Sequence, residues 1–191
     1  MLFRSERLQQ MLAELEMENT ERKHAVEELE RLSETDPLTS IYNRRKFNDI
    51  LSSEVERNKR YSTGLSVIMC DSDHFKKIND QFGHDVGDNA LKVFTSAISE
   101  NIREVDMFAR WGGEEFMILM PNTNADIARS VAEKLRQIVE ETEVKKVNTF
   151  TASFGVADLN EKDTTESLLK RVDEALYKAK NNGRNKVELS D

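Results

Sequence analysis

Residues 106–120 read Asp-Met-Phe-Ala-Arg-Trp-Gly-Gly-Glu-Glu-Phe-Met-Ile-Leu-Met. Mostly apolar segments at 106–111 and 116–120 flank Gly112-Gly113, and a pair of glycines between two such segments is typical of a β-hairpin. Glu114 and Glu115 then lie at the turn. The stretch therefore predicts two antiparallel strands joined by a turn that carries both glycine and acid.

Outward from this hairpin, the chain alternates between strand and helix patterns. Further strands are expected at 65–70, 149–157 and 186–189, the first of them a short apolar run with β-branched residues. Apolar residues at helical spacing predict helices at 39–60, 75–80, 86–101 and 125–141, and a last helix around 168–179. Mixed elements with one clear hairpin favour an α+β fold, in which helices cover a mainly antiparallel sheet.

Residues 1–35 differ from the rest in composition, since they contain no Gly or Pro and are rich in Glu, Leu, Arg and Met. They are expected to form a helix that ends at Asp36-Pro37, because the residue before a proline is pushed out of helical geometry. Two polar residues fall in the middle of an otherwise apolar heptad seam, which consists of Leu8, Met11, Leu15, Glu18, Arg22, Ala25, Leu29 and Leu32. A parallel dimeric coiled coil fits this seam. A single amphipathic helix that lies on the following domain is the alternative.

Bulk properties exclude several classes of protein. The 191 residues suit one domain plus an extra element, and the single Cys70 excludes an intramolecular disulfide. The net charge of -8 argues against a general nucleic-acid binder. No apolar run approaches the roughly 20 residues of a membrane span, and the chain begins without a signal-peptide pattern. We therefore expect a cytoplasmic protein with no membrane contact in this segment.

Three carboxylates are expected to lie near one another. Asp71 follows the first apolar strand, and Glu114 and Glu115 lie at the hairpin turn. Carboxylates that meet at a strand end repel one another unless cations accompany them, and hard oxygen ligands of this kind suit Mg²⁺. The alternative is three separate, solvated carboxylates near turns.

Five motifs follow one another in a fixed order along residues 36–186. They are Asp36-Pro37-Leu38-Thr39 with Asn43-Arg44-Arg45, the block from Asp71 to Asp80, Gly83-His84-Asp85-Val86-Gly87-Asp88, Gly112-Gly113-Glu114-Glu115-Phe116, and Ala175-Leu176-Tyr177-Lys178-Ala179-Lys180 with Gly183-Arg184-Asn185. Together they resemble the GGDEF family of diguanylate cyclases, in its GGEEF variant. The resemblance implies a fold like the palm of nucleotidyl cyclases and polymerases for residues 36–191.

The resemblance also implies a reaction and a metal site. Two GTP molecules would condense to cyclic di-GMP with release of two pyrophosphates, at a site with two Mg²⁺ ions or, as an alternative, Mn²⁺. Asp71 and Glu114 would hold the metals with the main-chain carbonyl of Ser72, a position where most relatives carry an aliphatic residue. Glu114 would be a metal ligand and also a candidate base. Glu115 would either complete the metal environment or only shape the turn.

Further roles follow from the resemblance for residues that would contact GTP. Asn79 and Asp88 would read guanine, although a helix-end cap and a helix-start charge are their commoner roles. Backbone groups at His74 and Phe75 would meet the triphosphate. Positive charge would come from Lys76, Lys180 and Arg184, the last two of which could also be simple C-terminal helix cations. Gly112 and Gly113 would let phosphate approach the backbone, or serve hairpin geometry alone, and Arg110 would face the reacting phosphate or a partner subunit.

Regulation is expected at two places. One domain binds one GTP, so two domains must face each other in a homodimer, which the N-terminal coiled coil would control in response to an upstream sensor domain in the same chain. Arg103 and Asp106 match the RxxD pattern of the family's inhibitory site for cyclic di-GMP, at its usual offset from Gly112. A surface Arg-Asp pair of little consequence is the alternative.

Three rival functions are compatible with parts of the sequence. A degenerate GGDEF domain would only bind GTP or cyclic di-GMP. Such domains usually lose the acidic residues of the signature, whereas Asp71, Glu114 and Glu115 are all present here. A cyclase for a different or mixed cyclic nucleotide is disfavoured by Asp88, since loss of this carboxylate is the expected route to accepting adenine. A structural dimerisation protein is supported by the N-terminal helix alone.

Overall fold

The computed structural model describes residues 11, 17–20, 22–23, 34–147 and 150–190. The chain divides into two units, Met1–Thr35 and Asp36–Asp191. Within the first unit Met11, Glu18 and Arg22 are helical and exposed. The remaining positions of the predicted seam, and with them the coiled coil itself, lie outside the described residues. None of the described helices has the length and apolar character that a membrane span requires.

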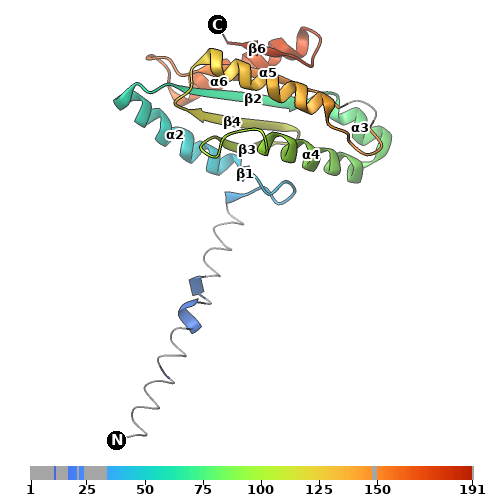
Figure 1. Cartoon of the computed structure of the whole chain (residues 1–191), viewed down its shortest axis with the longest axis horizontal. Helices are drawn as coiled ribbons and strands as arrows, with labels where there is room; N and C mark the ends of the chain where they lie inside the picture. Colours follow the sequence, from blue (N-terminus) through green and yellow to red (C-terminus); the bar gives the residue numbers. More distant parts are fainter. Residues whose placement is uncertain (1–10, 12–16, 21, 24–33, 148–149, 191) are drawn as a thin grey trace, which may run out of the picture. The chain divides into compact units, whose positions relative to one another are not determined.

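The second unit contains one mixed sheet and five helices among its described residues (Figure 1). In chain order the elements are β1 (Tyr42–Asn43), α2 (Arg44–Tyr61), β2 (Leu65–Ser72), α3 (Phe75–Phe82), α4 (His84–Ser99), β3 (Met107–Gly112), β4 (Glu115–Pro121), α5 (Ala125–Glu141), β5 (Ala152–Asp158), α6 (Thr165–Asn181) and β6 (Val187–Leu189). The strand order is β1-β3-β4-β2-β5-β6. The three inner pairs are antiparallel and the two outer pairs are parallel, which confirms the α+β, mainly antiparallel prediction.

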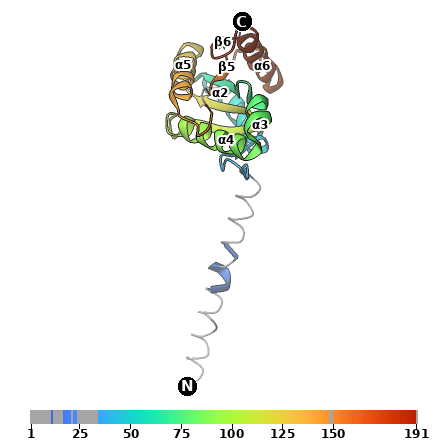
Figure 2. The same cartoon turned by 90° about the vertical axis from the view of Figure 1, so that its right-hand side faces the viewer.

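Helices cover both faces of this sheet (Figures 1 and 2). Alternate residues of β2 point to opposite faces, so Ile68 and Cys70 belong to one core cluster while Val67 and Met69 belong to the other. Buried residues of α3, α4 and α5 complete the first cluster, and those of α2 and α6 complete the second. All eight residues of β2 are buried, so this strand lies in the core and holds its last residues, Asp71 and Ser72, in place.

Several elements begin at other residues than predicted. The helix predicted from residue 39 begins at Arg44, because the Asn43 side chain accepts a hydrogen bond from the Lys46 N–H at 3.1 Å. Ile41 therefore lies outside the helix, and the two residues of β1 were not predicted. The strand expected at 149–157 begins at Ala152, and the helix expected from 86 already begins at His84.

Ser72 is buried at 1% exposure, and its hydroxyl has no hydrogen-bond partner among the described residues. Ser66, on the same strand, is also buried, but its hydroxyl donates to the Thr123 carbonyl oxygen at 2.9 Å. We expect Ser72→Ala to leave the free energy of unfolding unchanged or raise it by up to about 1 kcal/mol, and Ser66→Ala to lower it by about 1 kcal/mol. Urea unfolding of both variants checks this pair. An equal loss in both would show that the Ser72 hydroxyl is satisfied.

Candidate active site

The end of β2 and the β3–β4 turn are held together by the sheet. Asp71 is paired in register with Glu115, and the Ser72 N–H donates to the Glu114 carbonyl oxygen at 3.2 Å. The hydrogen-bond ladder therefore brings the three predicted acidic positions to one edge of the sheet. Their side chains nevertheless do not gather into a ready-made site, since among the residues described no three His, Cys, Asp or Glu side chains form a group able to hold a metal ion.

The glycines of the turn leave the backbone accessible. A Cβ added at Gly112 or Gly113 would meet no described atom within 4 Å, so side chains do not fill the space beside the turn. Gly113 has a φ of 51°, in the left-handed region that favours glycine. Both proposed roles of this pair, hairpin geometry and close approach of a ligand, are therefore compatible with the structure.

Asp71 is the most strongly perturbed acid of the site. It is 6% exposed, and its Oδ2 lies 2.8 Å from the Lys180 Nζ on α6. Burial raises the pKa of Asp71 to about 6; the Lys180 ammonium opposes this rise, while the negative charges of Glu114 and Glu115 add to it. The negative charge at this edge of the sheet exceeds what Lys180 compensates. Carboxylate and carbonyl oxygens are the donors that suit a divalent cation that retains water and shares phosphate oxygens, so the chemistry of Asp71, Glu114 and the Ser72 carbonyl is compatible with magnesium.

Arg110 is engaged in the protein itself. Its Nη1 lies 3.0 Å from Asp36 Oδ1, and its Nε and Nη2 donate to the Gly113 carbonyl oxygen at 2.9 and 2.7 Å. Although burial raises the pKa of Asp36, hydrogen bonds from Thr39 and Arg110 hold it below its ordinary value. The guanidinium thus joins the entry motif to the glycine turn. That Arg110 faces the reacting phosphate or a partner subunit stays a prediction.

The predicted guanine readers lie where α3 is followed by α4. An added Cβ at Gly87 would be 1.9 Å from Asn79 Oδ1, so the Asn79 amide lies directly against the first turns of α4. Asp88, the next residue, is exposed. The Asn79 main-chain oxygen accepts from the Gly83 N–H at 2.9 Å, and this bond closes the end of α3.

The start of α3 is suited to an anion. His74 precedes the helix in a left-handed conformation with φ 59° and makes no side-chain capping bond, so it leaves N–H groups at the start of the helix without a side-chain cap. Phe75 is buried, whereas His74 and Lys76 are exposed. Arg184 is also exposed and follows α6 with φ 60°. The cations proposed to contact triphosphate therefore come from α3, α6 and the loop after α6.

Arg103 and Asp106 are more than a surface pair. The Asp106 side chain is 1% exposed, and Arg103 Nη2 lies 2.6 Å from its Oδ1. Arg103 Nη2 also donates to the Thr123 hydroxyl at 2.9 Å, while about half of the arginine side chain remains exposed (49%). The buried Asp106 carboxylate therefore holds the half-exposed Arg103 guanidinium in place at the surface.

Comparison with known proteins assigns the family. The chain matches the family model described as diguanylate cyclase, GGDEF domain, over residues 33–186, and it belongs to that family. It is 39% identical over 168 residues to the diguanylate cyclase DgcM of Escherichia coli K12, covering 88% of this chain and 41% of that protein. It is 42% identical over 162 residues to the response regulator PleD of Caulobacter vibrioides, covering 82% of this chain and 36% of that protein. The chain therefore spans well under half of these relatives.

Solved structures agree with this assignment. The coiled coil and GGDEF domain of DgcB from Caulobacter crescentus, in complex with c-di-GMP, is similar with a TM-score of 0.89 at 29% identity, over 96% of this chain and 99% of that one. The active GGEEF domain of a diguanylate cyclase from Vibrio cholerae is similar with a TM-score of 0.75 at 38% identity, over 78% of this chain and 97% of that one.

Proposed function

We propose that this chain is a diguanylate cyclase that condenses two GTP molecules into cyclic di-GMP and two pyrophosphates. The observation that carries the proposal is the hydrogen bond from the Ser72 N–H to the Glu114 carbonyl, which fixes the strand end with Asp71 against the acidic glycine turn. Membership of the GGDEF family and the retained carboxylates support the same activity. A degenerate binding domain would not be expected to keep them.

Each residue then has a role in the attack of a 3′-hydroxyl on an α-phosphate. Asp71, Glu114 and the Ser72 carbonyl would hold two magnesium ions, or manganese in their place, with Glu115 beside them. When bound, these ions neutralise phosphate charge and orient the reacting oxygens. The N–H groups at the start of α3, with Lys76 and Arg184, would hold the triphosphate.

Lys180 has two partners in this proposal. Before substrate binds, its ammonium lies on Asp71, as the 2.8 Å ion pair indicates. The same ammonium can move to a phosphate oxygen once cations satisfy the carboxylate, because a lysine side chain is flexible and keeps its charge. Lys180 therefore keeps the buried acid ionised until the metal site is filled.

The reaction needs two active sites that face each other, so the active form is a homodimer in this proposal. The contacts of Arg110 suggest how residues 1–35, which are predicted to form a helix, would act on catalysis. Asp36 directly follows these residues in sequence, and Arg110 joins Asp36 to the Gly113 carbonyl oxygen. Control of catalysis by a coiled coil is consistent with this link from Asp36 to the glycine turn. That a sensor domain in the same protein supplies the signal stays a prediction.

Incubation of the purified protein with GTP and magnesium tests the proposed function. Chromatography with mass detection should find cyclic di-GMP and pyrophosphate in a 1:2 ratio. Chelation of the metal should stop the reaction. GTP that remains intact, in a folded and dimeric preparation, would refute the activity.

The inhibitory site is tested by Arg103→Ala. Loss of the planar guanidinium should raise the concentration of cyclic di-GMP needed for half-inhibition by about tenfold, while the initial rate stays near the parent value. Because this change leaves the buried Asp106 carboxylate with the Arg103 main-chain N–H but without the guanidinium, Arg103→Lys is made in parallel to keep a charge there. Arg57→Ala is the control, since Arg57 forms an exposed pair with Glu54. Progress curves that slow equally in the parent and both Arg103 variants would exclude the inhibitory site.

A further inference from the structure

The loop after α6 is held in an unusual backbone conformation. Gly183, Arg184 and Asn185 have φ angles of 107°, 60° and 47°. Residues with side chains rarely adopt the left-handed region, and such conformations persist only where the surrounding structure holds them. The Arg184 N–H donates to the Ala179 carbonyl oxygen at 3.1 Å, which closes the helix end but does not hold Asn185. Another set of contacts must therefore hold the loop.

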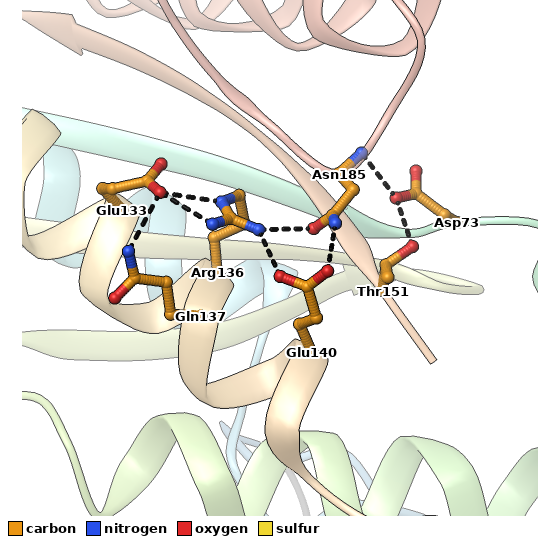
Figure 3. Close-up of polar contacts among 7 residues, drawn as sticks. All are labelled: Asp73, Glu133, Arg136, Gln137, Glu140, Thr151 and Asn185. Carbon is orange, nitrogen blue, oxygen red and sulfur yellow. Dashed lines mark hydrogen bonds and ion pairs between the residues drawn. The ribbon is translucent and has the colours of Figure 1, made fainter. Parts of the chain in front are cut away.

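Asn185 provides that set, as Figure 3 shows. Its N–H donates to Asp73 Oδ2 at 3.0 Å. Its side-chain amide lies between two residues of α5, because Oδ1 accepts from Arg136 Nη1 at 2.8 Å and Nδ2 donates to Glu140 Oε1 at 2.8 Å. Asn185 thus fixes the loop through Asp73 on one side and through Arg136 and Glu140 on the other, and we call these contacts the clamp.

Both sides of this clamp are themselves fixed. Asp73 is buried at 5% exposure, and its carboxylate also accepts from the Ser153 hydroxyl at 2.7 Å and the Thr151 hydroxyl at 2.9 Å. Arg136 is held by ion pairs with Glu133 at 2.8 Å and with Glu140 at 2.7 Å. Asp73 follows Asp71 by two residues, so one strand end anchors both Lys180 on α6 and the loop that carries Arg184.

From these contacts we infer that Asp73, Asn185 and Arg136 are positioning residues that set Arg184 for the triphosphate of GTP. The inference rests on the proposed function. None of the three side chains is assigned a contact with substrate; the clamp removes freedom from the loop before the ligand binds. Pre-organisation of this kind acts on affinity for the phosphates more than on the chemical step. Through Arg136 and Glu140 it also makes α5 a helix from which the substrate site can be weakened.

Two variants test the clamp without disturbing the buried Asp73 carboxylate. Asn185→Gly keeps the left-handed backbone and the N–H but removes the amide, and Arg136→Met removes the donor from α5. The control is Arg129→Met, an exposed arginine two turns earlier on the same helix. We expect both test variants to raise KM for GTP about tenfold while kcat stays within about twofold of the parent. The control should match the parent in both constants.

Binding of 3′-deoxy-GTP, which lacks the attacking hydroxyl, separates this inference from the proposed function because it requires no turnover. Calorimetry should give a weaker dissociation constant in both variants, in proportion to KM, with thermal unfolding midpoints near that of the control. Equal affinity in parent and variants would overturn the clamp while leaving the cyclase activity intact. The clamp is also refuted if kcat falls with KM unchanged. A parent that binds no 3′-deoxy-GTP and forms no cyclic di-GMP would refute both.

Discussion

Glu114→Gln is expected to reduce the formation of cyclic di-GMP by a factor of about a thousand or more, because the amide keeps the shape of the side chain but removes a charge that the metal ions require. The fold should survive, since Glu114 is tied to β2 through its main-chain carbonyl, which the substitution retains. Pyrophosphate release at saturating magnesium measures the loss, and the thermal unfolding midpoint checks the fold.

Glu115→Gln is the matched variant for this experiment. Glu115 is paired with Asp71 in register and lies one residue further along the same turn. A comparable loss would place Glu115 among the metal ligands, whereas a small loss would leave it a residue of the turn. Turnover of Glu114→Gln near the parent rate would show that the metal site has been assigned to the wrong acid.

Asp88→Ser is expected to lower the preference for GTP over ATP by about a hundredfold. A carboxylate can accept from both N1–H and N2–H of guanine, whereas adenine presents an acceptor at N1. Asp88 is exposed, so we expect less than the largest discrimination that a buried site can supply. Competition between the two nucleotides for a fixed amount of enzyme measures the ratio.

Asp85→Ser is the control for this second experiment. Asp85 is an acidic residue in the first turn of the same helix, where a negative charge stabilises the helix start. If Asp88 acts only as a helix-start charge, the two variants should behave alike. A GTP-to-ATP ratio that is unchanged in Asp88→Ser would refute its role in reading guanine.

Much of the fold could be predicted from the sequence because the patterns are local. The hairpin around Gly112-Gly113 and the buried run of β2 are visible as apolar segments with clear ends. The two residues of β1 are too few to carry a periodic signal. They form a strand through parallel pairing with β3, with Tyr42 opposite Ala109 and Asn43 opposite Arg110. Its presence depends on contacts between segments that are far apart in the chain.

The same distinction, between local patterns and contacts of distant segments, applies to the candidate site. The acidic positions could be predicted from their motifs, and the sheet register brings them to one edge. The partners of Arg110 and Lys180 could not be predicted, because Asp36 and Asp71 lie far from them in sequence. Asp73 and Asn185 both lie within the motifs, yet no local pattern signals that one holds the other across the fold.

In the proposed reaction, two guanine-reading sites join two GTP molecules. The most direct test is the mass spectrum of the products formed from an equimolar mixture of GTP and ATP with magnesium. We expect cyclic di-GMP as the sole cyclic dinucleotide, formed at the same rate as without ATP. A mixed guanine-adenine cyclic dinucleotide, or the absence of any cyclic dinucleotide from folded dimeric protein, would contradict it.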